Sequence, residues 1–327
     1  MTPITFPYRT EAEWLALRKV DVTSTESAAL FGLSPYLTAF ELYHQKRSGE
    51  LVVFEETTRM KWGKRLEATI AEGVAEDMGW VVQPLKVYMR SDRLACMGAS
   101  FDFEIVELKW PSLTDERGYF TTSGPGIMEI KNVDSLVFKN DWTETAAGWE
   151  APAHIEIQVQ HQLEVADREW AAIVALVGGN DPHVIIRQRD RAVGEALVQM
   201  IGQFWRDVAD GIEPAPDFQR DARFIAKLYG YAEPGKVIDW RNGQRADVAA
   251  LLQQYRQLGE LAKQTESERD AIKAQILLLI GDAEKVMTDA GTISAGVVGP
   301  TWVEAYERKG YRSFRFTPKK APKEATT

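Results

Sequence analysis

A glutamate and a lysine two positions apart are the residues best suited to chemistry in this sequence. Glu129 and Lys131 flank Ile130 in an apolar segment that follows a Gly-Pro-Gly turn, which is typical of a β-strand. Side chains alternate along a strand, so Glu129 and Lys131 are expected on one face and Ile130 on the buried face. Asp102, earlier in the chain, lies in another segment that we predict to be a strand.

Two carboxylates and a lysine fit metal-assisted hydrolysis of a phosphodiester bond. Hard divalent cations prefer carboxylate and carbonyl oxygens. A lysine can position or deprotonate the attacking water, or stabilise the charge that develops. The motif alone is weak, because Glu-x-Lys occurs three times in the chain and such pairs commonly serve solubility. The pair at Glu129 is favoured because it lies in an apolar strand after a turn. The pair Glu107 and Lys109 runs into a polar loop, and the pair Glu307 and Lys309 lies in the basic tail region.

Two predicted helices place more polar side chains beside core-facing stripes. In the helix over residues 153–166, Gln158 and Gln162 share one shoulder of the apolar stripe, and Gln160 lies on the opposite flank. In the helix over residues 58–78, Glu67 lies on such a shoulder. Side chains at these places can reach a site at the end of a sheet. An ordinary solvated shoulder is the alternative for each of them.

Several other classes of protein lack support. The chain has no P-loop, no dinucleotide-binding glycine fingerprint, no nucleophile elbow and no His-Glu-x-x-His. Cys96 is the only cysteine, which excludes an internal disulfide and predicts a cytoplasmic location. No apolar run approaches the roughly 18 residues needed to span a membrane. The net charge of −9 argues against a protein that coats nucleic acid, but not against a nuclease whose carboxylates hold cations.

The order of the predicted elements is typical of an α/β or α+β fold. Helices alternate with short strands from residue 10 to residue 210, and residues 107–124 are predicted to form a polar loop or hairpin. This pattern predicts a central mixed β-sheet flanked by helices. The elements that carry Asp102, Glu129 and the glutamines would then meet around that sheet.

A proline-rich segment at residues 214–216 marks the expected domain boundary. Residues 1–215 are predicted to form the core and residues 216–327 a helical C-terminal extension. The extension is predicted to contain a long helix over about residues 243–281, a small hairpin and a basic tail. The hairpin is predicted to form from Val286–Ser294 and Tyr311–Phe316. Five basic and five acidic residues in the long helix indicate a solvated or partner-packing face.

Together these motifs resemble the YqaJ-type viral recombinases, the lambda-type alkaline exonucleases of the PD-(D/E)xK nuclease superfamily. Five segments carry the resemblance in chain order over about residues 10–210: Arg18 with the run from Val22 to Tyr36, Trp62–Glu67, Gly98–Asp102, Glu129–Lys131 and Gln158–Leu163. The chain departs from the family pattern at Phe101 and Phe103, which replace the usual proline and glycine. The insertion between Asp102 and Glu129 is also longer than usual.

The resemblance implies a restriction-endonuclease-like nuclease core with a metal centre. Asp102, Glu129 and the carbonyl oxygen of Ile130 would bind Mg2+ or Mn2+, with two ions at each site. Glu67 would contact the second ion or its waters. Lys131 would orient or activate the attacking water.

The resemblance also implies a site for the end of the DNA. Gln158 would hold the metal centre from its helix, and Arg18, Thr25 and Ser100 fall where the family binds the terminal 5′-phosphate. Arginine suits bidentate contact with phosphate. The implied function is 5′→3′ degradation of linear double-stranded DNA in phage or prophage recombination, by a homo-oligomeric ring such as a trimer. The expected partners are double-stranded DNA ends and a single-strand annealing protein, with no membrane.

Two alternatives remain open on the sequence. One is a structure- or site-directed DNA endonuclease of the same fold, which would not need Arg18 and Thr25 to face the metal centre. The other is a nuclease-like assembly protein without catalysis, whose long helix binds partners. The intact set of Asp102, Glu129 and Lys131 argues against the second alternative.

Overall fold

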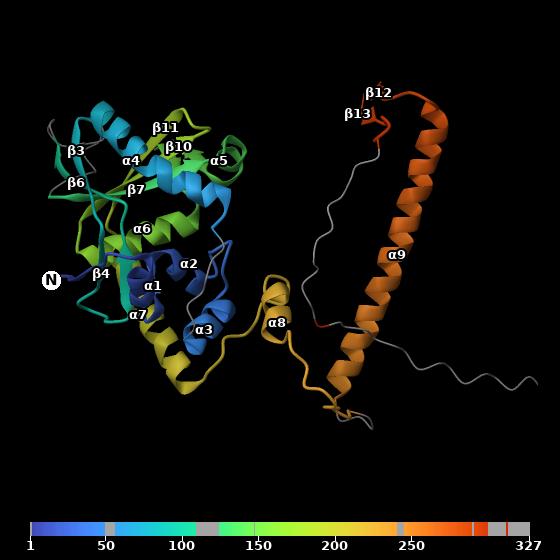
Figure 1. The fold of residues 1–327 in the computed structure, drawn as a ribbon, viewed down its shortest axis with the longest axis horizontal. Coiled ribbons are helices and arrows are strands. Elements are labelled where there is room, and N and C mark those ends of the chain that lie inside the picture. Colours follow the sequence, from blue (N-terminus) through green and yellow to red (C-terminus); the bar gives the residue numbers. More distant parts are fainter. Residues whose placement is uncertain are drawn as a thin grey trace, which may run out of the picture. The chain divides into compact units, whose positions relative to one another are not determined.

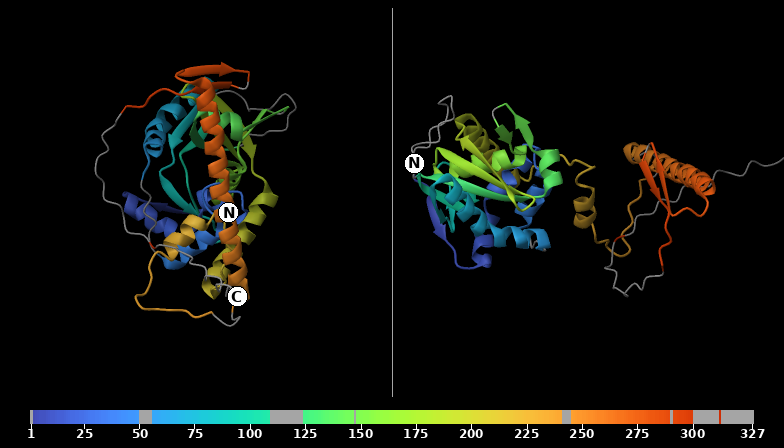
Figure 2. Two further views of the ribbon diagram at one scale, coloured as in Figure 1. Left: turned by 90° about the vertical axis from the view of Figure 1, so that its right-hand side faces the viewer. Right: turned by 90° about the horizontal axis from the view of Figure 1, so that it is seen from above.

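The computed structural model describes residues 2–49, 56–108, 124–146, 148–240, 245–289, 291–299 and 312. The chain folds into two compact units, Met1–Ile225 and Ala226–Thr327 (Figure 1). Both units are shown from two further sides in Figure 2. The chemically interesting residues all belong to the first unit.

A five-stranded mixed sheet forms the centre of the first unit. Its strand order is β11-β10-β7-β6-β3. The central pair, β7 and β10, is parallel, and every other pair is antiparallel. The strands are β3 Trp80–Pro84, β6 Phe103–Leu108, β7 Gly126–Val133, β10 Trp170–Val177 and β11 Asp181–Gln188. The predicted central mixed sheet flanked by helices is therefore confirmed.

Helices cover both faces of this sheet, and the alternation of side chains explains how. Helix α4, Thr58–Met78, packs on β7 and β3, while α6, Ala153–Ala166, packs on β7 and β10 (Figure 1). Met128 and Ile130 join the core beneath α4, and Ile127 joins the core on the opposite face. Glu129 is therefore directed to the face of α6.

A second, four-stranded sheet lies against the other side of α6. Its order is β1-β4-β5-β2, from Ile4–Pro7, Val87–Arg90, Met97–Ser100 and Val22–Thr23. His161 of α6 is fully buried, with its Nε2 3.0 Å from the carbonyl oxygen of Gly98 in β5. Burial lowers the pKa of His161 to about 4, so this histidine is neutral and holds the helix to the sheet.

The remaining helices of the first unit surround these sheets. They are α1 Glu11–Lys19, α2 Ser24–Leu30, α3 Ala39–Ser48, α5 Ser135–Asp141 and α7 Arg191–Asp210. Local sequence sets their ends: the Thr10 and Thr38 side chains cap α1 and α3, and Gly49 ends α3 in the left-handed conformation. Thr23 and Glu26 form a capping box at the start of α2.

Several expectations about local structure were wrong. Asp102 does not lie on a strand: it lies between β5, which ends at Ser100, and β6, which begins at Phe103. The apolar run is continuous there, but the chain passes from one sheet to the other, and this ends the strand pairing. The sequence patterns also did not reveal α5, the short pair β8 Thr143–Thr145 and β9 Gly148–Glu150, or α8 Ala222–Leu228. Residues 109–123 of the predicted polar loop lie outside the described residues.

The second unit contains α9, Ala246–Ile280, and a hairpin of β12 Lys285–Thr288 and β13 Gly291–Ser294. Because β12 and β13 pair with each other, the hairpin lies almost entirely within the predicted segment Val286–Ser294. Of Tyr311–Phe316, only Arg312 is among the described residues. In the described part of the chain, no helix combines the length and apolar character that a membrane crossing requires.

Gly98 is expected to be essential for packing between β5 and β4. A Cβ at this position would overlap the ring of the fully buried Tyr88 and lie 2.8 Å from Oδ2 of Asp21. We expect Gly98→Ala to lower the free energy of unfolding by about 1–3 kcal/mol. Gly73→Ala is the matched control, because a Cβ in this part of α4 would meet no atom within 4 Å. The control variant should raise the free energy of unfolding by about 0.5–1 kcal/mol. Urea unfolding followed by circular dichroism would measure both variants. Equal changes in the free energy of unfolding for Gly98→Ala and Gly73→Ala would contradict the importance of this packing.

Candidate active site

Glu129 is the centre of a buried hydrogen-bonded cluster. Its side chain accepts hydrogen bonds at Oε1 from Lys131 Nζ at 2.5 Å and Gln158 Nε2 at 2.7 Å. Its Oε2 accepts from Gln162 Nε2 at 2.7 Å. Lys131 Nζ also lies 3.2 Å from Gln158 Oε1. The carboxylate is 3% exposed and is held from β7 on one side and from α6 on the other. Its position is fixed by three donors.

Asp102 reaches the same strand from the link between the two sheets. Its Oδ2 accepts a hydrogen bond from the backbone N–H of Ile130 at 2.9 Å. Ile130 lies between Glu129 and Lys131, so this one bond brings both carboxylates to the same point of β7. The structure thus brings together residues that are far apart in the chain.

The electrostatics of the cluster are those of crowded carboxylates around one cation. Burial raises the pKa of Asp102 well above its usual value, and the charge of Glu129 raises it further. Burial and then Glu129 likewise raise the pKa of Glu67, which lies on α4. Burial alone would lower the pKa of Lys131, but the charges of Glu129 and Asp102 outweigh it and raise that pKa. Lys131 is therefore protonated, and it does not neutralise all three carboxylates.

This group of three acidic side chains fits a divalent cation, which would favour their ionised forms. The donors are carboxylate oxygens, which suit Mg2+ or Mn2+ rather than softer metals. Among the described residues, no three His, Cys, Asp or Glu side chains converge as a preformed metal cage. Both oxygens of Glu129 are engaged by Lys131, Gln158 and Gln162. Oε1 accepts two of these hydrogen bonds and Oε2 accepts one, so Oε2 keeps a lone pair that could bind a cation.

A second cluster surrounds Arg18 at the end of α1. The guanidinium Nη2 lies 3.2 Å from Thr25 Oγ1 and 3.3 Å from Thr23 Oγ1. The guanidinium carbon lies 4.5 Å from the centre of the Trp14 ring, a cation–π distance. Trp14 Nε1 donates to Ser100 Oγ at 2.7 Å. Arginine, threonine and serine, which are suited to phosphate, therefore share one place.

Ser100 joins the two clusters. Its carbonyl oxygen accepts from Gln162 Nε2 at 3.1 Å, and the same amide nitrogen donates to Glu129. Ser100 is also two residues before Asp102. The Tyr8 hydroxyl lies within the electrostatic influence of both clusters, because Arg18 lowers its pKa and Asp102 raises it. The largest effect on Tyr8 is burial, and its pKa is raised overall.

Lys46 and Glu26 hold the C-terminal end of α1, which carries Arg18. Lys46 Nζ donates to the carbonyl oxygen of Arg18 at 3.2 Å and forms an ion pair with Glu26 at 2.9 Å. Burial would raise the pKa of Glu26, but Lys46 and then Arg18 lower it overall. The Arg18 cluster is thus braced from α3 and α2.

The side chains that the sequence assigned to the site lie in or beside the two clusters: Arg18, Thr25, Ser100, Asp102, Glu129, Lys131 and Gln158 by contact, and Glu67 by its electrostatic interaction with Glu129 and Lys131. Their roles remain predictions. Gln162 was predicted to share with Gln158 a shoulder that can reach the site, but it was given no role. Trp14 was not assigned to the site, although it lies four residues before Arg18. Tyr8 had no such signal. Gln160, on the other flank of α6, instead bonds to the backbone of Gln188 and Asp190.

Comparison with known proteins gave a family match and several similar proteins. Residues 13–169 match the family described as "YqaJ-like viral recombinase domain". The chain is 26% identical over 269 residues to "Uncharacterized protein YqaJ" of Bacillus subtilis (strain 168), covering 81% of this chain and 77% of that protein. The crystal structure of an alkaline exonuclease, LHK-Exo, from Laribacter hongkongensis matches with a TM-score of 0.46 and 19% identity, over 66% of this chain and 99% of that one. A putative exonuclease from Eubacterium rectale matches with a TM-score of 0.43 and 11% identity, over 73% of this chain and 100% of that one.

Proposed function

We propose, on the premise that residues 13–169 match the YqaJ-like viral recombinase domain, that the chain is a metal-dependent deoxyribonuclease. Its proposed substrate is linear double-stranded DNA, which it degrades 5′→3′ from the end. We place this activity in phage or prophage recombination and in the cytoplasm. The proposal includes a homo-oligomeric ring, such as a trimer, that passes the remaining strand to a single-strand annealing protein.

One observation carries the proposal: the cluster at Glu129 and the cluster at Arg18 are joined through Ser100. A carboxylate cluster with a protonated lysine suits phosphodiester hydrolysis, and a neighbouring arginine with hydroxyls suits a terminal phosphate. An enzyme that cuts inside a duplex would have no use for an end-binding site beside its hydrolytic residues. The link from Ser100 through Gln162 to Glu129 therefore favours an exonuclease over an endonuclease.

The residues of this chain would divide the reaction among them. Asp102, Glu129 and the Ile130 carbonyl would hold Mg2+ or Mn2+, with Glu67 beside them. The cation would supply Lewis-acid stabilisation of the negative charge that develops on the phosphate. Lys131 would orient the attacking water and, if it loses its proton, act as the base. Gln158 and Gln162 fix the Glu129 carboxylate, and their loss would leave it free to turn away from the reacting phosphate.

The test is degradation of a linear duplex with a 5′-phosphate at one end only, beside a closed circular duplex. With Mg2+, we expect consumption of the linear DNA from the phosphorylated end and no change in the circle. EDTA should stop the reaction. Cutting of the circle at a comparable rate would replace the proposal with an endonuclease of the same fold. No cleavage of either substrate by folded protein with Mg2+ or Mn2+ would refute a nuclease.

Mg2+ or Mn2+ is expected to raise the melting temperature, because a cation that binds only the folded protein relieves the repulsion among Asp102, Glu129 and Glu67. The shift should shrink as the pH falls, because protons compete for carboxylates whose pKa is raised. Asp102→Asn should abolish the shift, whereas Asp210→Asn, at the exposed end of α7, should keep it. Differential scanning calorimetry with and without the cation would measure this. An equal shift in both variants would place the cation elsewhere.

A further inference from the structure

Helix α9 is uncovered along its whole length in the part of the chain that the structure describes. None of its 35 residues is buried. Helices in proteins owe most of their stability to packing of an apolar face. Leu258, Ile272 and Leu279 are 65%, 58% and 85% exposed, which is unusual for leucine and isoleucine side chains. The helix therefore presents apolar side chains that a partner could cover.

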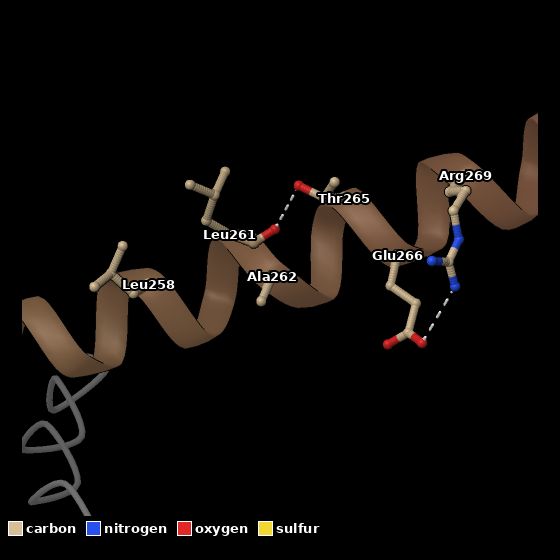
Figure 3. Close-up of a pocket in the computed structure, with 6 residues that line it drawn as sticks. All are labelled: Leu258, Leu261, Ala262, Thr265, Glu266 and Arg269. Carbon is tan, nitrogen blue, oxygen red and sulfur yellow. Dashed lines mark hydrogen bonds and ion pairs between the residues drawn. The ribbon is translucent and has the colours of Figure 1, made fainter. Parts of the chain in front are cut away.

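These side chains form a heptad stripe. Positions separated alternately by three and four residues run the length of the helix: Val248, Leu251, Tyr255, Leu258, Ala262, Thr265, Arg269, Ile272, Ile276 and Leu279. Apolar residues at this spacing are the a and d positions of a coiled coil. Val248 begins the pattern as an a position and Leu251 as a d position. Figure 3 shows the middle of the stripe, where Glu266 forms an ion pair with Arg269 at 3.8 Å.

We infer that this stripe packs against the same stripe of a second copy of the chain, in a parallel, in-register, two-stranded coiled coil. Charge supports the choice of a second copy. Glu268 occupies a g position and Lys273 the e position five residues later. In a parallel pair, g of one helix lies beside the following e of the other, so these residues form two interhelical ion pairs. The surface is thus complementary to itself.

An antiparallel pair fits the same residues less well. Aligning the full stripes in opposite directions places Leu251 opposite Ile276, and by the same count Glu268 lies opposite Gly259 and Lys273 opposite Gln254. Neither Glu268 nor Lys273 then lies opposite a charged residue. The parallel register gives each of them an oppositely charged partner.

The a and d residues at both ends of the stripe favour two strands. Val248 with Leu251, and Ile276 with Leu279, place a β-branched residue at a and leucine at d, which is the combination preferred by parallel dimers. Arg269 is the one charged residue in the stripe. A polar residue at a single a position lowers stability and fixes the register and the number of strands. This interface lies in the second unit, so it does not depend on the proposed active site and it is an additional contact to those of the proposed ring.

Cross-linking of the full-length chain tests the register. In a Cys96→Ser background, Leu251→Cys is expected to give a disulfide-linked dimer under mild oxidation, because the two d positions face each other. In the antiparallel alignment the two positions are 25 residues apart along the helix, or about 38 Å, and no link would form. Gln253→Cys, on the outer side of the same helix, is the control and should not cross-link. Absence of the Leu251 link, or equal linking at both positions, would overturn the inference.

The mass of the assembly tests the stripe itself. The double variant Leu258→Lys, Ile272→Lys is expected to have a smaller molar mass by light scattering than the wild-type chain at the same concentration. Leu278→Lys is the matched control, because Leu278 is 85% exposed but lies outside the stripe, and it should keep the wild-type mass. An unchanged mass in the double variant, or a wild-type chain that is a monomer, would overturn the inference.

Discussion

Replacing Lys131 by methionine is expected to lower the rate of cleavage at duplex ends by about 10²–10⁴-fold, the range for loss of a positioned proton-transfer group. Methionine keeps much of the apolar length of lysine but cannot donate to Glu129 Oε1, where Lys131 Nζ now lies at 2.5 Å. Binding of a DNA end should be nearly unchanged, because the Arg18 cluster is intact. Single-turnover cleavage and a separate binding assay would measure the two effects.

Lys139→Met is the control for this change. Lys139 is an exposed lysine of α5, and its loss should leave cleavage within about twofold of the wild type, as for most surface substitutions. Circular dichroism of Lys131→Met would verify that the chain is folded. A folded Lys131→Met protein that cleaves at the wild-type rate would remove Lys131 from the reaction.

Replacing Arg18 by alanine is expected to abolish the preference for a 5′-phosphate. Hydrogen bonds to charged groups contribute about 1.5–3 kcal/mol, so cleavage from a phosphorylated end should fall roughly 10–150-fold. Cleavage from a 5′-hydroxyl end should change little, because that end makes no such contact. The ratio of the two rates, measured on otherwise identical duplexes, reports the role of Arg18 directly.

Two further variants sharpen the result for Arg18. Arg18→Lys keeps the charge but loses the planar fork, and it should lie between the wild type and Arg18→Ala. Lys19→Ala removes an exposed neighbouring charge from the same helix and should keep the preference. If Arg18→Ala slowed both kinds of end equally, Arg18 would act on DNA binding in general rather than on the terminal phosphate.

Much of the core could be predicted because its signals are local. The spacing of apolar residues and the residues at the helix ends predicted the first and last residues of α4 and α6 correctly. The alternation of side chains along a strand predicted that Glu129 and Ile130 face opposite sides of the sheet. The residues of the candidate site were assigned from the family resemblance of five short motifs in chain order. Glu129 and Lys131 lie on one strand, β7, and Gln158 lies on one helix, α6, so their placement depends on local geometry.

Other features depend on contacts between distant residues and could not be predicted. Asp102 was placed on a strand because its neighbours are apolar, but those neighbours, Phe101 and Phe103, belong to different parts of the core. The position of Tyr8 depends on how β1 pairs with β4, and no local pattern specifies this. Helix α5 is only seven residues long, and its start depends on hydrogen bonds from the Leu136 and Val137 N–H groups to Asp134.

The passage of the chain between the two sheets has a consequence for the size of the product. Ser100 is the last residue of β5 in one sheet, and Asp102 lies just before β6 in the other sheet. Only Phe101 separates Ser100 from Asp102. Three consecutive Cα atoms span at most about 7.6 Å. If Ser100 receives the terminal phosphate and Asp102 the cation, their backbone separation is a molecular ruler set by covalent geometry and by the packing of Phe101. Every cut would then fall at the same distance from the end, and the fragments released would have one uniform length.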